Sequence, residues 1–284
     1  MKSILFLITA IVISITLSSS VQKGSNDNIT LQATGKNVTP ALLKQSGDVI
    51  SARLKQYGIN QSEVKVVPDK GQLIVMLSEK TDISEVEGLL TSKGELSFYE
   101  TYTHAELSDL LKTDNQLFTL LSSAQNSSPS DPRVGCTSGV KDKANGYLHS
   151  AAPIKYCKLL WGNKSEKSGY CLFALKTNQD GKPLLLRSDI ESVKMATMND
   201  PQDFKIQIKL NPAATKVFAD ATERNMNKSI AIVIDNQVYS WPVVRSAIKE
   251  GEIEVTGDFT KNEANYFPVV FNSPQLPLDF KILK

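Results

Sequence analysis

The side chains best suited to chemistry in this 284-residue chain are three cysteines, Cys136, Cys157 and Cys171, with only His104 and His149 available as a neighbouring base. A nucleophilic or redox cysteine works as a thiolate, which an adjacent base or a second cysteine in a C-x-x-C motif stabilises. The chain contains no C-x-x-C motif. We therefore expect the cysteines to have a structural role.

Other patterns that resemble catalytic motifs have structural explanations. Residues 135–139, GCTSG, share the outline of a nucleophile elbow, but Thr137 occupies the nucleophile position and the flanks do not read as a strand and a helix, so a loop is predicted. Of three carboxylates, Asp235 and Asp258 fall in predicted turns and Glu263 in a capping box. No phosphate-binding loop or H-E-x-x-H motif is present. We expect no enzyme, no cofactor and no metal site.

The charge balance excludes a polyanionic partner. Lys and Arg number 32 against 30 Asp and Glu, and no block of five or six like charges occurs. Such a chain has no counterpart to a phosphate backbone, so nucleic acid is not expected as a partner. With 41% hydrophobic residues, the composition is that of a globular protein, and its length allows two modest domains.

The N-terminus has the pattern of a signal peptide. Met1-Lys2 precedes an apolar run over residues 4–17, and Ser18 and Ser20 provide small residues before a cleavage site. The run is about 14 residues, short of the roughly 20 that span a bilayer. We predict a signal peptide at residues 1–20, with an uncleaved anchor as the alternative, and membrane contact only through that leader.

Export would place the cysteines in an oxidising compartment, where two of the three are expected to pair. Cys157 and Cys171 flank residues 161–169, a Gly-, Asn-, Lys- and Ser-rich stretch that reads as a hairpin tip. We predict a disulfide between these two, which leaves Cys136 unpaired.

The elements that must position these residues are clearest from residue 28 to residue 102. Alternating apolar residues predict a strand near residues 29–34, and Thr39-Pro40 begins a helix that Gly58 ends. Strands are predicted at Glu63–Pro68 and Gln72–Leu77, a helix capped by Asp82, and a strand at Glu95–Tyr102. This order, βαββαβ, predicts a ferredoxin-like arrangement.

The middle of the chain gives weaker signals. We predict a helix at residues 105–121, a Ser-, Asn-, Pro- and Gly-rich surface loop at residues 122–146, and a cysteine-bearing segment up to residue 182. From residue 205 an α+β pattern returns. It comprises the following: a strand at 205–210, a helix after Asn211-Pro212, a hairpin at 230–240 with Asp235-Asn236 as its turn, a strand at 252–256, a helix after Thr260 that Pro268 should end or kink, and a strand at 278–283.

Residues 230–264 carry a resemblance to a known family. They read IAIVIDNQVYSWPVVRSAIKEGEIEVTGDFTKNEA and are similar to the first periplasmic domain of the SecD family, which has a strand "iAivlDg.v", a small-residue–Pro corner, and "I..G...ItG.f" before a helix. The preceding helix resembles the family's "ga..Fa.lT..n.gk", with Phe218, Thr222 and Asn225 in register. A weaker similarity covers residues 40–103.

The chain also departs from that family. Asn236 replaces a turn glycine, Trp241 stands where a small residue is usual, and Pro274 replaces a glycine. The membrane part that carries the family's proton-coupling residues is missing from this sequence. Proton-driven pulling is therefore not expected of this chain alone.

The resemblance implies an α+β protein with two parts. A ferredoxin-like base would cover residues 28–103, with 276–284 returning to it, and an α+β head would cover residues 104–273, with a variable loop-rich insert at 122–182. Crossings between the parts, which would act as hinges, are implied at Tyr102-Thr103 and Ser273-Pro274.

By the same resemblance, the chain would act outside the cytoplasm, in the periplasm or on the outer face of the inner membrane. It would bind unfolded or translocating polypeptide, alongside subunits of the Sec translocase. Tyr239, Trp241 and Val243 form an aromatic-rich strand end that would contact an extended client by β-augmentation, unless Trp241 instead fills the core. The alternative function is a stand-alone envelope scaffold of the same fold that binds another protein.

Overall fold

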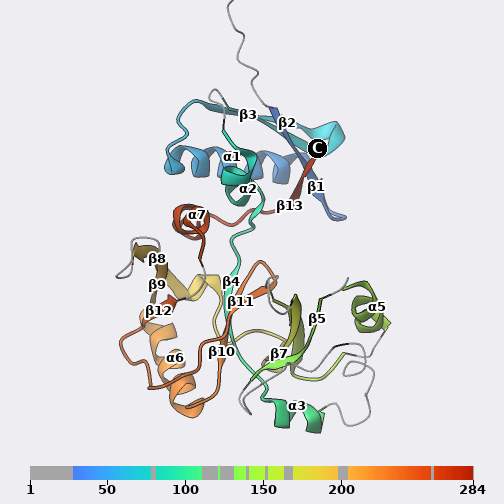
Figure 1. Ribbon diagram of the computed structural model, residues 1–284. Coiled ribbons are helices and arrows are strands. Elements are labelled where there is room, and N and C mark those ends of the chain that lie inside the picture. Colours follow the sequence, from blue (N-terminus) through green and yellow to red (C-terminus); the bar gives the residue numbers. More distant parts are fainter. Residues whose placement is uncertain are drawn as a thin grey trace, which may run out of the picture.

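The computed structural model describes residues 28–77, 81–110, 121, 131–138, 141–150, 153–162, 169–197, 204–256 and 259–283. The predicted signal peptide and Asp258 lie outside these residues. The chain forms a mixed α+β structure, as predicted, and its described residues contain four small antiparallel sheets. Figure 1 shows one sheet with two helices above and the other three sheets below. We call the upper part the base and the lower part the head.

The base consists of one sheet and two helices. Its elements are β1 (Asn28–Thr34), α1 (Pro40–Tyr57), β2 (Ser62–Val67), the short 3₁₀ helix Pro68–Lys70, β3 (Gln72–Leu77), α2 (Ile83–Thr91) and β13 (Asp279–Leu283). The strand order is β13-β1-β3-β2. The C-terminal strand therefore returns to the base and pairs with β1.

One strand of the predicted base sheet was assigned to the wrong part of the molecule. β4 (Leu96–Glu100) pairs with β10 (Ile230–Ile234) in the head, while β13 takes the place of the fourth ferredoxin-like strand. Phe98 is fully buried, and its neighbour Tyr99 is 3% exposed. A strand with both faces buried needs covering on both sides, which the head provides and an open base sheet would not.

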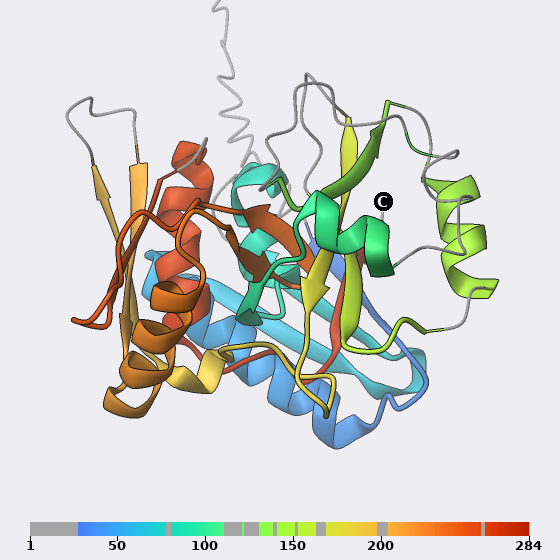
Figure 2. The same cartoon turned by 90° about the horizontal axis from the view of Figure 1, so that it is seen from below.

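The head contains three sheets of three strands each among the described residues, in the orders β11-β10-β4, β12-β9-β8 and β5-β7-β6. Its remaining elements are α3 (His104–Leu110), β5 (Arg133–Thr137), α5 (Asp142–Ser150), β6 (Cys157–Trp161), β7 (Tyr170–Lys176), the 3₁₀ helix Arg187–Asp189, β8 (Ile190–Thr197), β9 (Phe204–Leu210), α6 (Pro212–Arg224), β11 (Gln237–Ser240), β12 (Glu252–Thr256) and α7 (Lys261–Asn272). In Figure 2 the β12-β9-β8 and β5-β7-β6 sheets lie on opposite sides of the head.

Parts of the middle segment are more ordered than the sequence indicated. Residues 122–146 were predicted as a loop, yet β5 and the start of α5 fall inside this range. Val134 and Cys136 are buried, because β5 pairs with the apolar strand β7. Pairing with a distant strand, rather than local pattern, makes this segment a strand.

Helix α7 joins the head to the base. It packs against α1 and α2 on one side and β8 on the other, and Phe267, Val270 and Phe271 belong to a core cluster that also contains residues of the base sheet. The helix continues past Pro268 to Asn272, so of the two predicted effects of this proline, an end or a kink, the end is wrong. Burial of the flanking apolar residues offsets the one backbone hydrogen bond that proline removes.

The predicted disulfide is also wrong: Cys136 bonds to Cys171, and Cys157 is free. The register of the sheet explains the pairing, because Cys136 lies directly opposite Cys171 whereas Cys157 lies opposite Lys176. Five residues along a strand separate positions 171 and 176 by about 17 Å. Cys157 is thus far beyond disulfide reach of Cys171.

Candidate functional site

An apolar pocket of about 180 Å³ opens in the head, between β10, α6 and the irregular segment that follows β11. Its walls are mostly hydrophobic: Phe98, Phe218, Ile230, Ile232, Val243 and Ile253 are among the lining residues. Arg245 and Glu254 also line it, and both are exposed. The pocket therefore presents an apolar interior to solvent with one charge of each sign on its walls.

The sheet edge beside this pocket is open. β12 is the outermost strand of its sheet, and no other described strand pairs with its outer side. The amide of Leu210 donates to the Gly251 carbonyl, so in this antiparallel register the backbone groups of Gly251, Ile253 and Val255 face β9. The backbone groups of Glu252 and Glu254 consequently point outward, in a position to pair with an added strand.

The structure does not bring Tyr239, Trp241 and Val243 together on one surface. The Tyr239 hydroxyl donates to Glu263 Oε1 at 2.7 Å, at the junction with the base. The Trp241 ring packs 4.6 Å from the ring of Phe173, against a core cluster. Only Val243 lines the apolar pocket.

The pocket residues Phe98 and Phe218, whose rings lie 5.6 Å apart, were not predicted from the sequence as part of a site. They come from β4 and α6, 120 positions apart in the chain, so no local pattern joins them. The sequence signal available for Phe218 was its place on the apolar face of a predicted helix, which indicates burial but not a pocket.

The junction between base and head is held by Arg53, whose side chain is fully buried on α1. Its guanidinium donates to the Ser273 hydroxyl at 2.8 Å and to the carbonyls of Ser92 at 2.6 Å and Pro274 at 3.2 Å. It thereby binds both segments that connect the two parts. Burial lowers the pKa of Arg53 to about 10, and the nearby charge of Asp235 opposes that shift, so Arg53 remains a cation at neutral pH.

Asp235 binds the same junction from the head. It lies in the turn between β10 and β11 with φ at 45°, and its carboxylate accepts hydrogen bonds from the Ser92 hydroxyl and from the amides of Lys93 at 2.9 Å and Glu95 at 2.8 Å. Burial raises the pKa of Asp235, while these hydrogen bonds act in the opposite direction. The turn carboxylate, which the sequence indicated was structural, therefore connects distant parts of the chain.

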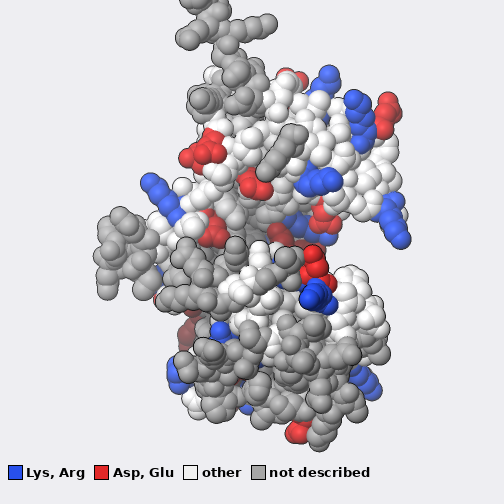
Figure 3. Space-filling model, turned by 45° about the vertical axis from the view of Figure 1, so that its right-hand side comes forward, with Lys and Arg blue, Asp and Glu red and all other residues white. Residues whose placement is uncertain are grey.

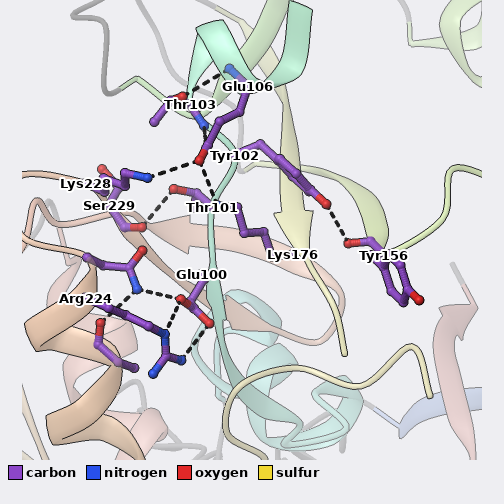
Figure 4. A network of polar contacts seen from close by, with 12 residues as sticks. Glu100, Thr101, Tyr102, Thr103, Glu106, Tyr156, Lys176, Arg224, Lys228 and Ser229 are labelled. Carbon is purple, nitrogen blue, oxygen red and sulfur yellow. Dashed lines mark hydrogen bonds and ion pairs between the residues drawn. The ribbon is translucent and has the colours of Figure 1, made fainter. Parts of the chain in front are cut away.

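The first predicted crossing, at Tyr102-Thr103, is misplaced. Because β4 lies in the head, the chain crosses at residues 92–95. Figure 4 shows Tyr102 and Thr103 within a polar network instead: the Thr103 amide donates to Glu106 Oε2 at 2.8 Å, and the Tyr102 hydroxyl donates to the Tyr156 carbonyl.

In this network the Nζ atoms of Lys176 and Lys228 both lie 3.1 Å from Glu106 Oε1, the carboxylate oxygen that does not accept from Thr103. Partial burial acts to raise the pKa of Glu106, but the Thr103 amide and the two lysines outweigh it and lower that pKa to about 2. Because these contacts fix the segment at Tyr102-Thr103, we do not expect the chain to hinge there. Ser273 and Pro274 do lie at the second crossing, where both contact Arg53. Whether the chain hinges at Ser273-Pro274 stays a prediction.

The free thiol of Cys157 is expected to be unreactive. Burial raises the pKa of Cys157 to about 12, so it is protonated at neutral pH and a poor nucleophile. Over the described ranges, no cluster of three or more His, Cys, Asp or Glu side chains could hold a metal ion. In the same part of the chain, no helix has both the length and the hydrophobicity to cross a membrane.

Comparison with known proteins confirms the predicted relation to the first periplasmic domain of SecD. Residues 173–278 match the family described as the SecDF P1 head subdomain. The chain is 27% identical over 251 residues to the protein translocase subunit SecD of Calditerrivibrio nitroreducens, covering 88% of this chain and 41% of that protein. It is 31% identical over 108 residues to the protein translocase subunit SecDF of Thermus thermophilus, covering 38% of this chain and 15% of that protein. The chain thus spans less than half the length of these relatives.

Solved structures agree on the fold. A structure described as the membrane component SecDF that enhances protein export matches with a TM-score of 0.51 and 19% identity, over 90% of this chain and 98% of that one. SecDF in its super-membrane-facing form matches with a TM-score of 0.53 and 19% identity, over 90% of this chain and 29% of that one. At this level of identity the matches show the fold alone.

Proposed function

We propose that this SecD-related chain is an exported protein-binding module that assists Sec-dependent translocation by contacting the emerging polypeptide. The observation that carries the proposal is the apolar pocket of the head, which opens beside the free edge of β12. Most of the residues that form it fall within residues 173–278, the part related to the SecDF P1 head.

The size of the pocket favours a side chain over a cofactor. Pockets for cofactors and drug-sized ligands enclose roughly 300–1,000 Å³. At about 180 Å³ this pocket is smaller, and its interior is lined mostly by aliphatic and aromatic side chains. One large apolar side chain of a polypeptide suits that volume, and such a site discriminates weakly between sequences.

The free edge of β12 suits the backbone of the same polypeptide. An extended segment that adds to a sheet edge gains main-chain hydrogen bonds whatever its sequence, while alternate side chains enter neighbouring pockets. Ile253 and Glu254 belong to β12 and also line the pocket. A client strand paired with β12 would therefore carry its side chains past the pocket opening.

The relation to SecD also motivates the proposed place of action, outside the cytoplasm at the periplasmic or outer face of the inner membrane. Contact with subunits of the Sec translocase belongs to the same proposal. The chain spans 41% of the SecD of Calditerrivibrio nitroreducens, and any activity of that whole relative belongs to the same proposal.

A binding experiment with a matched pair of variants tests the proposal. The affinity of a fluorescent, permanently unfolded apolar polypeptide is measured for the wild type, Val243→Asp and Val217→Asp. Val217 is an exposed valine of α6 that does not line the pocket. We expect Val243→Asp to weaken binding about tenfold or more, since a charge would face an apolar surface, and Val217→Asp to bind as the wild type does.

Thermal melts of all three proteins separate binding from folding. If the folded wild type binds no unfolded chain at a concentration of tens of micromolar, the proposal fails and an envelope scaffold of the same fold takes its place. Equal losses in Val243→Asp and Val217→Asp would remove the pocket as the binding site.

A further inference from the structure

A second, larger groove lies between the base and the head, with a volume of about 580 Å³. Its walls come from α2, from the β10–β11 hairpin and from the first half of α7. None of the residues that line it is used by the apolar pocket of the head. Its chemistry is also different, because polar and charged side chains make up much of its surface.

Among the described residues that line this groove, every charged side chain is acidic. These side chains are Glu87 on α2, Asp235 in the hairpin turn and Glu263 on α7. The bias is local, since Lys/Arg and Asp/Glu side chains both occur along the waist between base and head seen in Figure 3. A concave surface that carries several carboxylates concentrates a negative electrostatic potential.

The three carboxylates differ in how far their charge is already compensated. Asp235 accepts hydrogen bonds from the Ser92–Glu95 segment and has the Arg53 cation nearby. Glu263 accepts from the Tyr239 hydroxyl and from Thr260. Glu87 is exposed and forms no ion pair with any described residue. Its charge is therefore available to a partner.

Aromatic rings stand beside these carboxylates. The half-buried rings of Tyr239 and Tyr266 line the groove, and the buried Phe267 ring, which is 1% exposed, packs behind them at 5.5 Å and 4.8 Å. The face of an aromatic ring attracts cations because its quadrupole places negative charge there, and the polar hydroxyl of a tyrosine can stay in contact with water. Carboxylates and aromatic rings together favour a cation carried on an apolar stem, which describes lysine and arginine.

We propose that the base–head groove binds lysine or arginine side chains of the same extended polypeptide whose hydrophobic side chains enter the apolar pocket. This inference rests on the proposed function, since it assigns the same client a second point of contact. It adds a preference for clients that carry basic as well as apolar residues in an extended segment.

The test uses two unfolded peptides with the same apolar residues, one with lysines and the other with glutamines at the intervening positions. Their affinities are measured for the full chain, Glu87→Lys and the control Glu85→Lys, at low and high salt. Glu85 is an exposed residue of the same helix that does not line the groove. The two variants have the same net charge, so a general electrostatic effect would act on both alike.

We expect the wild type to prefer the lysine peptide, and Glu87→Lys to reduce its affinity for that peptide roughly fivefold while leaving the glutamine peptide unchanged. Glu85→Lys should retain the preference. Equal binding of the two peptides by the wild type, or equal losses in both variants, would overturn the inference.

The outcomes also distinguish this inference from the proposed function. If Val243→Asp weakens both peptides and Glu87→Lys weakens neither, the apolar site stands and the basic site is wrong. If free lysine amide, at the concentration of the peptide, displaces it fully, the groove binds a small cation rather than a polypeptide, and the inference is likewise overturned.

Discussion

Arg53 of the base and Asp235 of the head bind opposite ends of one residue, Ser92. The guanidinium of Arg53 donates to the Ser92 carbonyl at 2.6 Å, and the Asp235 carboxylate accepts from the Ser92 hydroxyl. Arg53 also contacts Ser273 and Pro274, so a single buried cation fixes both connections between base and head. The relative position of the two parts thus depends on a few polar contacts as well as on the packing of α7.

Replacement of Arg53 should therefore destabilise the whole chain. Arg53→Met keeps much of the side-chain volume but leaves Asp235 and several buried carbonyls without their cation, which is expected to cost on the order of 3–5 kcal/mol. Urea unfolding followed by circular dichroism measures this loss. Lys44→Met is the control, because the Lys44–Asp48 pair is exposed and should contribute less than about 0.5 kcal/mol. A loss below about 1 kcal/mol for Arg53→Met would contradict the role assigned to it.

Glu106 should make stability depend on pH in the acid range. Its pKa in the folded chain is lowered from 4.5 to about 2, so its ionised form stabilises the fold above pH 4.5, and this contribution is lost as the pH falls from about 4.5 toward 2. We expect Glu106→Gln to be less stable than the wild type at pH 6 and the difference to shrink by pH 3. Urea titrations at both pH values measure it. A difference that stays constant would show that the Glu106 charge contributes nothing.

The disulfide should follow the register of the sheet. Non-reducing peptide mapping is expected to find Cys136 linked to Cys171 with Cys157 free. The bond joins residues 35 positions apart, and the chain-entropy model assigns such a loop about 4 kcal/mol. Cys136→Ser should therefore lower the unfolding free energy by an amount of this order, whereas Cys157→Ser should have a much smaller effect. A bond that contains Cys157 would disprove the assignment.

Trp241 should behave as a core residue and not as a binding anchor. Its ring packs on Phe173, so Trp241→Ala is expected to cost about 3 kcal/mol or more in stability through the cavity that it leaves. Any loss of client binding should then follow the fraction of unfolded protein in a melting curve recorded under the same conditions. A variant that melts like the wild type but no longer binds the client would restore Trp241 to the binding surface.

The sequence predicts that the base and the head, placed at residues 28–103 and 104–273, fold as separate units, and this stays a prediction. The core cluster that α7 shares with α1 and α2 favours unfolding in one step. Limited proteolysis with mass spectrometry would decide, because separate units would release a stable fragment.

Local sequence signals determined most individual elements of this protein. Thr39 with Pro40, Asn211 with Pro212 and the Thr260–Glu263 capping box all cap helices where the sequence predicted them. These signals succeed because caps, tight turns and strand alternation depend on residues within a few positions of one another. The motifs at residues 230–264 are likewise short patterns of neighbouring residues, and they were sufficient to indicate the relation to SecD.

Tertiary structure alone decided which strands pair and therefore where the candidate sites lie. β4 reads as the closing strand of the base, yet it pairs with β10, more than 130 residues later, and β13 takes its place. Cys136 pairs with Cys171 because β5 and β7 are in register, which no spacing in the sequence encodes. Strand pairing between distant segments is decided by burial of both faces in the assembled core. The apolar pocket, the acidic groove and the contact of Arg53 with both crossings all follow from that assembly.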